Sequence, residues 1–146
     1  MLARLPEDVH AQVTALSAAG DDQVRLGNYD AAIDSYEDAL ALLPGPTTQW
    51  DAATWLLTAI GDTHFLKRDF AAARTALQDA MHAPGAIGNP FVHLRLGQAQ
   101  FELGDMNRAK DELVRAYMGA GERIFEGEDP KFLNLVKATI RPPASP

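Results

Sequence analysis

The chain has 146 residues, a length typical of one domain with a single hydrophobic core. Its 47% hydrophobic and 23% charged residues are average for a soluble protein and argue against a disordered, collagen-like or membrane-spanning chain. With 13 Lys and Arg against 20 Asp and Glu, the net charge is −7, so the chain lacks the basic surface that binding to nucleic acid requires.

The beginning of the chain has no apolar run of signal-peptide length, because Pro6, Glu7 and Asp8 interrupt it. No apolar run long enough to span a membrane follows, so we expect no membrane as a partner. The absence of cysteine removes disulfides and thiolate-bound zinc. The absence of cysteine leaves the redox compartment undecided, and the lack of a signal-peptide run and of a membrane span predicts a cytoplasmic protein.

Three pairs of helices are expected in chain order. Their first helices begin at three start signals: Pro6-Glu7-Asp8, a capping box Thr48-Gln49-Trp50-Asp51, and Asn89-Pro90. Each first helix ends at a short break, where Gly allows a positive φ and Asn or Asp can cap the next helix: Gly27-Asn28, Arg68-Asp69 and Gly104-Asp105. Apolar residues then recur at steps of three or four, which predicts second helices that begin at Tyr29, Phe70 and Met106.

The pairs are repeats of one another. Gly20, Gly61 and Gly97 are separated by 41 and 36 residues. The same two intervals relate two alanine columns: Ala32, Ala73 and Ala109, then Ala39, Ala80 and Ala116. Small residues at fixed intervals predict that the two helices of each pair approach closely there, with larger residues filling the space between.

A last helix is expected after the third pair. Pro130 opens a segment that is strongly apolar as far as Ile140, and a stack of repeats needs a helix to cover its final apolar face. We interpret residues 130–140 as this capping helix. The alternative is a detachable segment that docks on a partner. Residues 141–146 are expected to be a flexible tail.

The segment Gly27–Pro44, GNYDAAIDSYEDALALLP, resembles the second half of a tetratricopeptide repeat. The resemblance implies an all-α fold, an alpha-alpha superhelix of three such helical hairpins plus a C-terminal capping helix. We expect a single domain over residues 1–140, with repeats at about 6–46, 47–88 and 89–120. Because the first interval exceeds the family's ~34 residues, we expect a lengthened first helix in the second repeat, with Trp50 beyond its usual start.

Catalytic or metal chemistry is not expected. The four histidines, His10, His64, His82 and His93, lack the i+4 partner of a helical zinc site. The acidic residues of the run 126–129 do not have the alternating ligands of a calcium loop and are better explained as a solvated helix start. With no phosphate loop and no nucleophile elbow, the sequence predicts a protein that is not an enzyme and has no cofactor.

The resemblance further implies a concave groove lined by the first helices, and such surfaces commonly bind other proteins. The residues expected on this groove are Asp21, Arg25, Trp55, Thr58, Asp62, Phe65, Phe91, Arg95, Gln98, Phe101 and Glu102. Exposed aromatic residues would serve as anchors for a partner, and the acidic residues would attract Lys or Arg. The alternative is that the four aromatic side chains pack between helices.

A protein or peptide segment that is both apolar and basic is therefore the expected partner. Members of the family that hold the acidic C-termini of Hsp70 and Hsp90 use a clamp of Lys, Asn and Arg, and of the matching residues here only Arg95 fits. The run Phe125–Phe132 is similar to tails of small bacterial repeat proteins that act as dedicated chaperones or immunity proteins for secreted toxins. The competing hypothesis is a homo-oligomeric scaffold without a foreign client.

Overall fold

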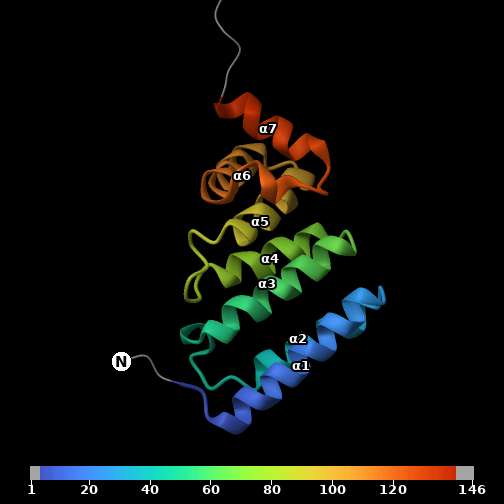
Figure 1. Cartoon of the computed structure of the whole chain (residues 1–146), viewed down its shortest axis with the longest axis vertical. Coiled ribbons are helices and arrows are strands. Elements are labelled where there is room, and N and C mark those ends of the chain that lie inside the picture. Colours follow the sequence, from blue (N-terminus) through green and yellow to red (C-terminus); the bar gives the residue numbers. More distant parts are fainter. Residues whose placement is uncertain (1–3, 141–146) are drawn as a thin grey trace, which may run out of the picture. The chain divides into compact units, whose positions relative to one another are not determined.

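The computed structural model describes residues 4–140, and within them all regular structure is helical (Figure 1). The described residues contain no helix with both the length and the apolar character of a membrane span. The chain divides into two compact units between Ala86 and Ile87. The all-α architecture of three helical hairpins and a terminal helix is confirmed. The single domain over residues 1–140 stays a prediction, and the expected tail lies outside the described residues.

Unit 1 contains the first two hairpins. Its elements are α1 (Glu7–Arg25), α2 (Tyr29–Ala41), the 3-10 helix η1 (Thr47–Gln49), α3 (Asp51–Leu66) and α4 (Phe70–Ala80). The breaks within both hairpins lie where the sequence predicts them. Gly27 has a φ of 77°, and Arg68 takes the same left-handed conformation at 65°. Asp69 caps α4 by accepting from the Ala72 N–H, whereas Asn28 makes no such cap for α2.

The glycine column has the predicted role in unit 1. A Cβ added at Gly20 would lie 2.5 Å from the ring of Tyr36, and one at Gly61 would lie 2.5 Å from Leu77 Cγ. The two helices of each hairpin are therefore in contact through a position that only glycine can occupy without rearrangement. The alanine column, including Ala32 and Ala73, is fully buried beside it.

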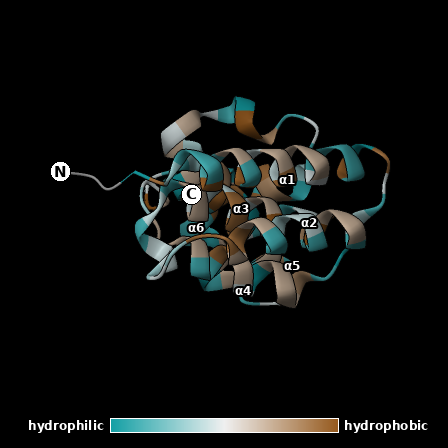
Figure 2. Ribbon diagram, turned by 90° about the horizontal axis from the view of Figure 1, so that it is seen from below, coloured by the Kyte–Doolittle hydropathy of each residue, from teal (hydrophilic) through white to brown (hydrophobic). Residues whose placement is uncertain are grey.

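The helices of unit 1 differ in how much of their surface they bury. Over its whole length α1 buries Val13 and Gly20, whereas α3 buries residues on most of its circumference. Figure 2 shows the same contrast, with more hydrophobic colour along α3 than along α1. The central position of α3 between α2 and α4 within unit 1 explains this pattern, because it packs against both.

The predicted capping box at Thr48 is wrong. Residues 47–49 form η1, α3 begins at Asp51, and no side chain caps its first turn. The reason is tertiary: the buried Trp50 donates from Nε1 to the Pro44 carbonyl oxygen at 2.7 Å, which holds Trp50 in an extended conformation. The first helix of the second repeat is not the longest of the three, since α3 has 16 residues against 19 in α1 and 13 in α5, and Trp50 lies just before it.

Unit 2 contains the third hairpin and the terminal helix. Its elements are α5 (Pro90–Glu102), α6 (Met106–Ala120), the 3-10 helix η2 (Glu122–Phe125) and α7 (Pro130–Ile140). Asn89 caps α5 as predicted, by accepting from the backbone N–H of Phe91 at 3.0 Å. Gly97 lies against Leu113, in the same way as Gly20 lies against Tyr36 and Gly61 against Leu77 in unit 1. The last helix has the predicted bounds 130–140, and it packs on α6 with Phe132 and Val136 buried.

Candidate functional site

The expected groove residues of unit 1 lie on α1 and α3. We call Trp55, Thr58, Asp62 and Phe65 the α3 face. Trp55 is 39% exposed, a large value for a tryptophan in a folded domain. Thr58 is half-buried and donates to the Thr54 carbonyl oxygen of its own helix at 2.6 Å, and Phe65 meets the edge of Phe70 with 5.5 Å between ring centroids. Phe65 therefore packs within its hairpin, as the alternative reading of the aromatic residues expects, while Trp55 is open to solvent.

A pocket of about 460 Å³ lies beside Trp55. We call it the N-terminal pocket. Its lining comes from the beginning of the chain and of α1, and from the beginning of α3: Arg4, Leu5, Glu7, His10, Trp50, Asp51, Ala52 and Trp55. Trp50, which donates from Nε1 to the Pro44 carbonyl oxygen, forms part of the pocket wall. Apart from Trp55, sequence reasoning did not identify this pocket, and two tryptophans five residues apart were the available signal.

Two carboxylates of the expected groove act on one hydroxyl group. Tyr36 Oη donates to Asp21 Oδ1 at 2.5 Å, and the negative charge of Asp62 on α3 also acts on this hydroxyl. Burial, the hydrogen bond to Asp21 and the negative charges of Asp21 and Asp62 all raise the pKa of Tyr36, while Arg25 lowers it. We call Asp21 and Asp62 the acidic pair. Arg25 itself is exposed and forms an ion pair with Asp22.

Unit 2 places its expected residues differently. We call Phe91, Arg95, Gln98, Phe101 and Glu102 the α5 face. Phe91 is 36% exposed and lies 5.1 Å from the Arg95 guanidinium. Arg95 is buried, and Gln98 is completely buried. Both donate to Glu128 Oε1 from the segment before α7, Gln98 at 2.7 Å, so a carboxylate of the chain itself neutralises the arginine.

The rest of the α5 face is covered by the beginning of α7. Phe101 makes an edge contact with Phe132 at 5.2 Å between centroids, and Lys131 Nζ lies 2.5 Å from Glu102 Oε1. The Lys131 ammonium also lies 5.2 Å from both rings. We call Glu128, Lys131 and Phe132 the C-terminal cover. Sequence reasoning interpreted Glu128 as part of a solvated helix start, and the structure corrects this interpretation, because the carboxylate is engaged with Arg95 and Gln98.

The one histidine in the sequence of unit 2 has a structural role. His93 is buried, its Nε2 accepts from the Gly88 N–H at 2.8 Å, and its Nδ1 lies 2.5 Å from Glu112 Oε2. Both ring nitrogens are therefore used in holding α5 to its neighbours. Within residues 4–140, histidine and carboxylate side chains form no cluster of three or more that could hold a metal ion.

Comparison with known proteins agrees with this architecture. Residues 15–44 match the model of the tetratricopeptide repeat, and no curated protein matches the chain in sequence at a significant level. The first tetratricopeptide repeat domain of human RPAP3 is similar in structure, with a TM-score of 0.68 and 20% identity over 90% of this chain and 98% of that one. PcrH from Pseudomonas aeruginosa is also similar, with a TM-score of 0.68 and 18% identity over 96% of this chain and 98% of that one.

A further similar structure contains a ligand. It is the first tetratricopeptide repeat of Spaghetti (RPAP3) bound to the HSP90 peptide SRMEEVD, with a TM-score of 0.65 and 20% identity over 90% of this chain and 92% of that one. The resemblance to the tetratricopeptide repeat family is thus confirmed: the chain carries such a repeat at residues 15–44 and has the fold of these domains.

Proposed function

We propose that the chain is a non-enzymatic protein-binding module of the cytoplasm, in which α1 and α3 of unit 1 hold a segment of one partner protein. The observation that carries the proposal is the exposed Trp55 on the same helix as Asp62. An exposed tryptophan beside a pocket is a typical binding anchor, because its burial contributes a large apolar area at a small cost in conformational entropy. The partner segment is apolar and basic.

The charge of unit 1 supports a basic partner. In the acidic pair, Asp21 accepts from Tyr36 Oη and the charge of Asp62 acts on the same hydroxyl. A Lys or Arg side chain that approaches the acidic pair gains attraction that a carboxylate would not. The similar structure bound to SRMEEVD holds an acidic peptide. Here the arginine that most resembles such a site, Arg95, is engaged with Glu128, which argues against the same ligand.

Selection from a random peptide library displayed on phage tests the proposal on the full chain. We expect the recovered peptides to carry a net positive charge together with bulky apolar residues. Trp55→Ala should weaken the binding of a recovered peptide by about thirtyfold, the equivalent of ~2 kcal/mol for an interface anchor. Asp62→Asn should weaken it by about tenfold, whereas the exposed Asp34→Asn on α2 serves as the matched control and should have no effect. Recovery of acidic peptides, or of none, would contradict the proposal.

A narrower hypothesis is that the client is a secreted toxin, for which the chain acts as a dedicated chaperone or immunity protein. Its support is the compact acidic repeat architecture, which suits one basic or apolar client. Co-purification of the chain with the product of an adjacent gene tests it, and the Trp55→Ala variant should lose that client.

The competing function is a homo-oligomeric scaffold, in which Trp55 contacts a second copy. Light scattering over a range of concentrations separates the two hypotheses. We expect a monomer at all concentrations. A stable dimer that dissociates on Trp55→Ala would favour the scaffold and overturn the proposal of a foreign client.

A further inference from the structure

A second hollow of unit 1 lies between the ends of its two second helices, α2 and α4. It has a volume of about 770 Å³ and is open to solvent. This size falls within the range of about 300–1,000 Å³ that is usual for binding clefts. We call it the α2–α4 groove. Besides residues of η1, the side chains that line it are Glu37, Leu40, Ala41, Leu57, Asp79 and His82.

The groove and the α3 face lie on opposite sides of α3. Trp55 and Leu57 are two residues apart, and at about 3.6 residues per turn their side chains point about 200° apart around the helix axis. Leu57 lines the groove, whereas Trp55 lines the N-terminal pocket, and the two hollows share no lining residue. A ligand in the groove is therefore not expected to cover Trp55.

The interior of the groove is apolar. Leu57 is buried, and Leu40 is partly buried against the core of unit 1. Ala41, the last residue of α2, is exposed. A bulky apolar side chain that covered Leu40 and Ala41 would remove additional apolar surface from water, which favours binding.

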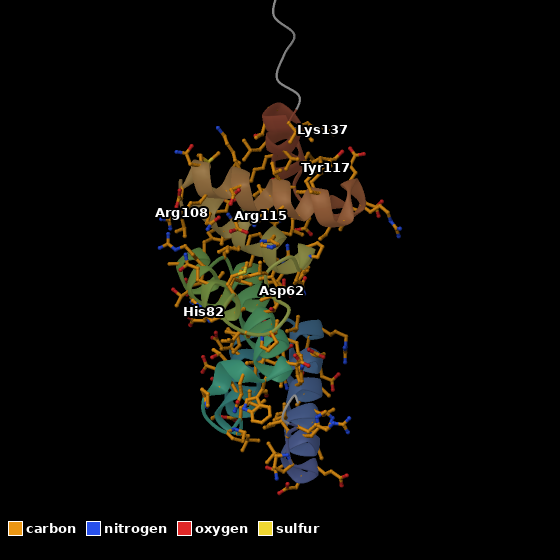
Figure 3. The ribbon with its side chains drawn as sticks, turned by 90° about the vertical axis from the view of Figure 1, so that its left-hand side faces the viewer. Asp62, His82, Arg108, Arg115, Tyr117 and Lys137 are labelled. Atoms are coloured by element: carbon orange, nitrogen blue, oxygen red, sulfur yellow. The ribbon has the colours of Figure 1, made fainter. Side chains whose placement is uncertain are left out.

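The charged side chains of the groove are mainly negative. Glu37 on α2 and Asp79 on α4 are exposed, and within residues 4–140 neither carboxylate has a hydrogen bond or an ion pair. In this they differ from Asp30, which is paired with Lys67. His82, labelled in Figure 3, is the one lining residue that can carry a positive charge. Two carboxylates are thus available to a ligand.

The helix ends at the groove add to the negative potential. The carbonyl groups at the C-terminus of a helix carry a partial negative charge, which a nearby Lys or Arg stabilises. Neither α2 nor α4 has a basic residue in its last turn, and α2 has four acidic residues and no basic one. Side chains and backbone therefore make the groove complementary to a cationic ligand.

We infer that the α2–α4 groove is a second docking surface, and that its occupant is a partner segment in which a bulky apolar residue is flanked by Lys or Arg. The apolar residue covers Leu40 and Ala41, and the basic residues pair with Glu37 and Asp79. The inference goes beyond the proposed function, because a segment bound here leaves the α3 face open to the partner segment proposed above.

Differential selection from a random peptide library displayed on phage gives the first test. One target is the Trp55→Ala chain, whose α3 face has lost its anchor, and the other is the same chain with Glu37→Gln and Asp79→Asn added. We expect peptides that are recovered on the first target and lost on the second, with Lys or Arg within two residues of a bulky apolar residue. Recovery of the same peptides on both targets, of acidic peptides, or of none on the first target would overturn the inference and leave the proposed function intact.

Titration calorimetry of one recovered peptide with the full chain gives the second test. Glu37→Gln and Asp79→Asn should each weaken binding by about fivefold, the upper end for an ion pair near the surface. Ala41→Arg should weaken it by at least tenfold, because it places a bulky cation where the apolar residue of the peptide binds. Asp38→Asn is the matched control: Asp38 is exposed and adjacent to Glu37 but does not line the groove, so the affinity should change less than twofold.

The four substituted positions are exposed, so we expect each variant to keep the urea unfolding midpoint of the wild type, measured by tryptophan fluorescence. An equal loss of affinity in Asp38→Asn and Glu37→Gln would show that the overall charge of α2, and not the groove, attracts the peptide. That result, or unchanged binding by Ala41→Arg, would overturn the inference.

Discussion

The α3 face of unit 1 and the α5 face of unit 2 occupy equivalent repeat positions but differ in how far the rest of the chain covers them. Both begin with a partly exposed aromatic residue, Trp55 and Phe91. One turn later they diverge, because Ala59 in α3 is replaced by Arg95 in α5, and Arg95 is buried against Glu128. The repeat register therefore determines the position of a side chain on the helix face. The segment that follows the repeat determines whether that side chain is available to a partner.

The largest expected effect comes from a substitution that breaks the ion pair between the α5 face and Glu128. Arg95→Ala leaves the Glu128 carboxylate and the buried Gln98 amide without their arginine, and it should destabilise unit 2 by about 3 kcal/mol, as expected when one member of a buried ion pair is removed. Hydrogen exchange of the backbone amides in α5 and α6 measures the loss. Arg108→Ala is the control, because Arg108 is exposed and lies 3.6 Å from Asp105 (Figure 3). Equal protection in the two variants would mean that the cover does not stabilise α5.

A second substitution sharpens the comparison because it lies in unit 1. Ala73→Leu overpacks the contact between α3 and α4 and should destabilise unit 1 by roughly 1–3 kcal/mol. Both tryptophans of the chain lie in unit 1, so tryptophan fluorescence during urea unfolding reports this loss. Ala71→Leu, at an exposed position of the same helix, should leave the midpoint unchanged. Equal midpoints for the two variants would show that the alanine column is not a tight contact.

A smaller effect is expected at the edge of the C-terminal cover. Lys131→Met keeps the aliphatic stem and removes the charge that contacts Glu102 and the two rings, so unit 2 should lose about 0.5–1 kcal/mol. A double-mutant cycle with Glu102→Gln isolates the ion pair. Additive losses would indicate that the contacts with the rings, and not the pair, carry the effect.

The smallest effect concerns pH. Lys67 Nζ donates to Asp30 Oδ1 at 2.5 Å, and this hydrogen bond lowers the pKa of Asp30 below its usual 3.8 and raises the pKa of Lys67 above its usual 10.5. The contribution of Asp30 to the stability of unit 1 is therefore present at neutral pH and is lost as the pH falls through its lowered pKa. That of Lys67 is lost only as the pH rises through its raised pKa.

Fluorescence-monitored urea unfolding at pH 7 and pH 3 tests this dependence. The wild type should exceed Asp30→Asn slightly in stability at pH 7, and the difference should shrink at pH 3 and in 1 M NaCl, because both side chains are at the surface. A difference that grows on acidification would contradict the assignment.

Local patterns predicted most of the fold. The second helices begin at Tyr29, Phe70 and Met106 as expected, because a break residue and a helical apolar period are both readable within one turn. The capping box at Thr48 failed, since the indole bond of Trp50 to Pro44 outweighs a local capping preference. The engagement of Glu128 with Arg95, 33 residues away, could not be predicted, because a pattern of charges does not show which long-range pair is buried together.

The C-terminal cover has a practical consequence for anyone who shortens this protein. Trimming the chain after α6 would remove Glu128 and Phe132, which cover the Arg95 guanidinium and the Phe101 ring in the intact molecule. A trimmed version would lose the carboxylate that neutralises Arg95, so its binding properties would describe the fragment and not the intact protein.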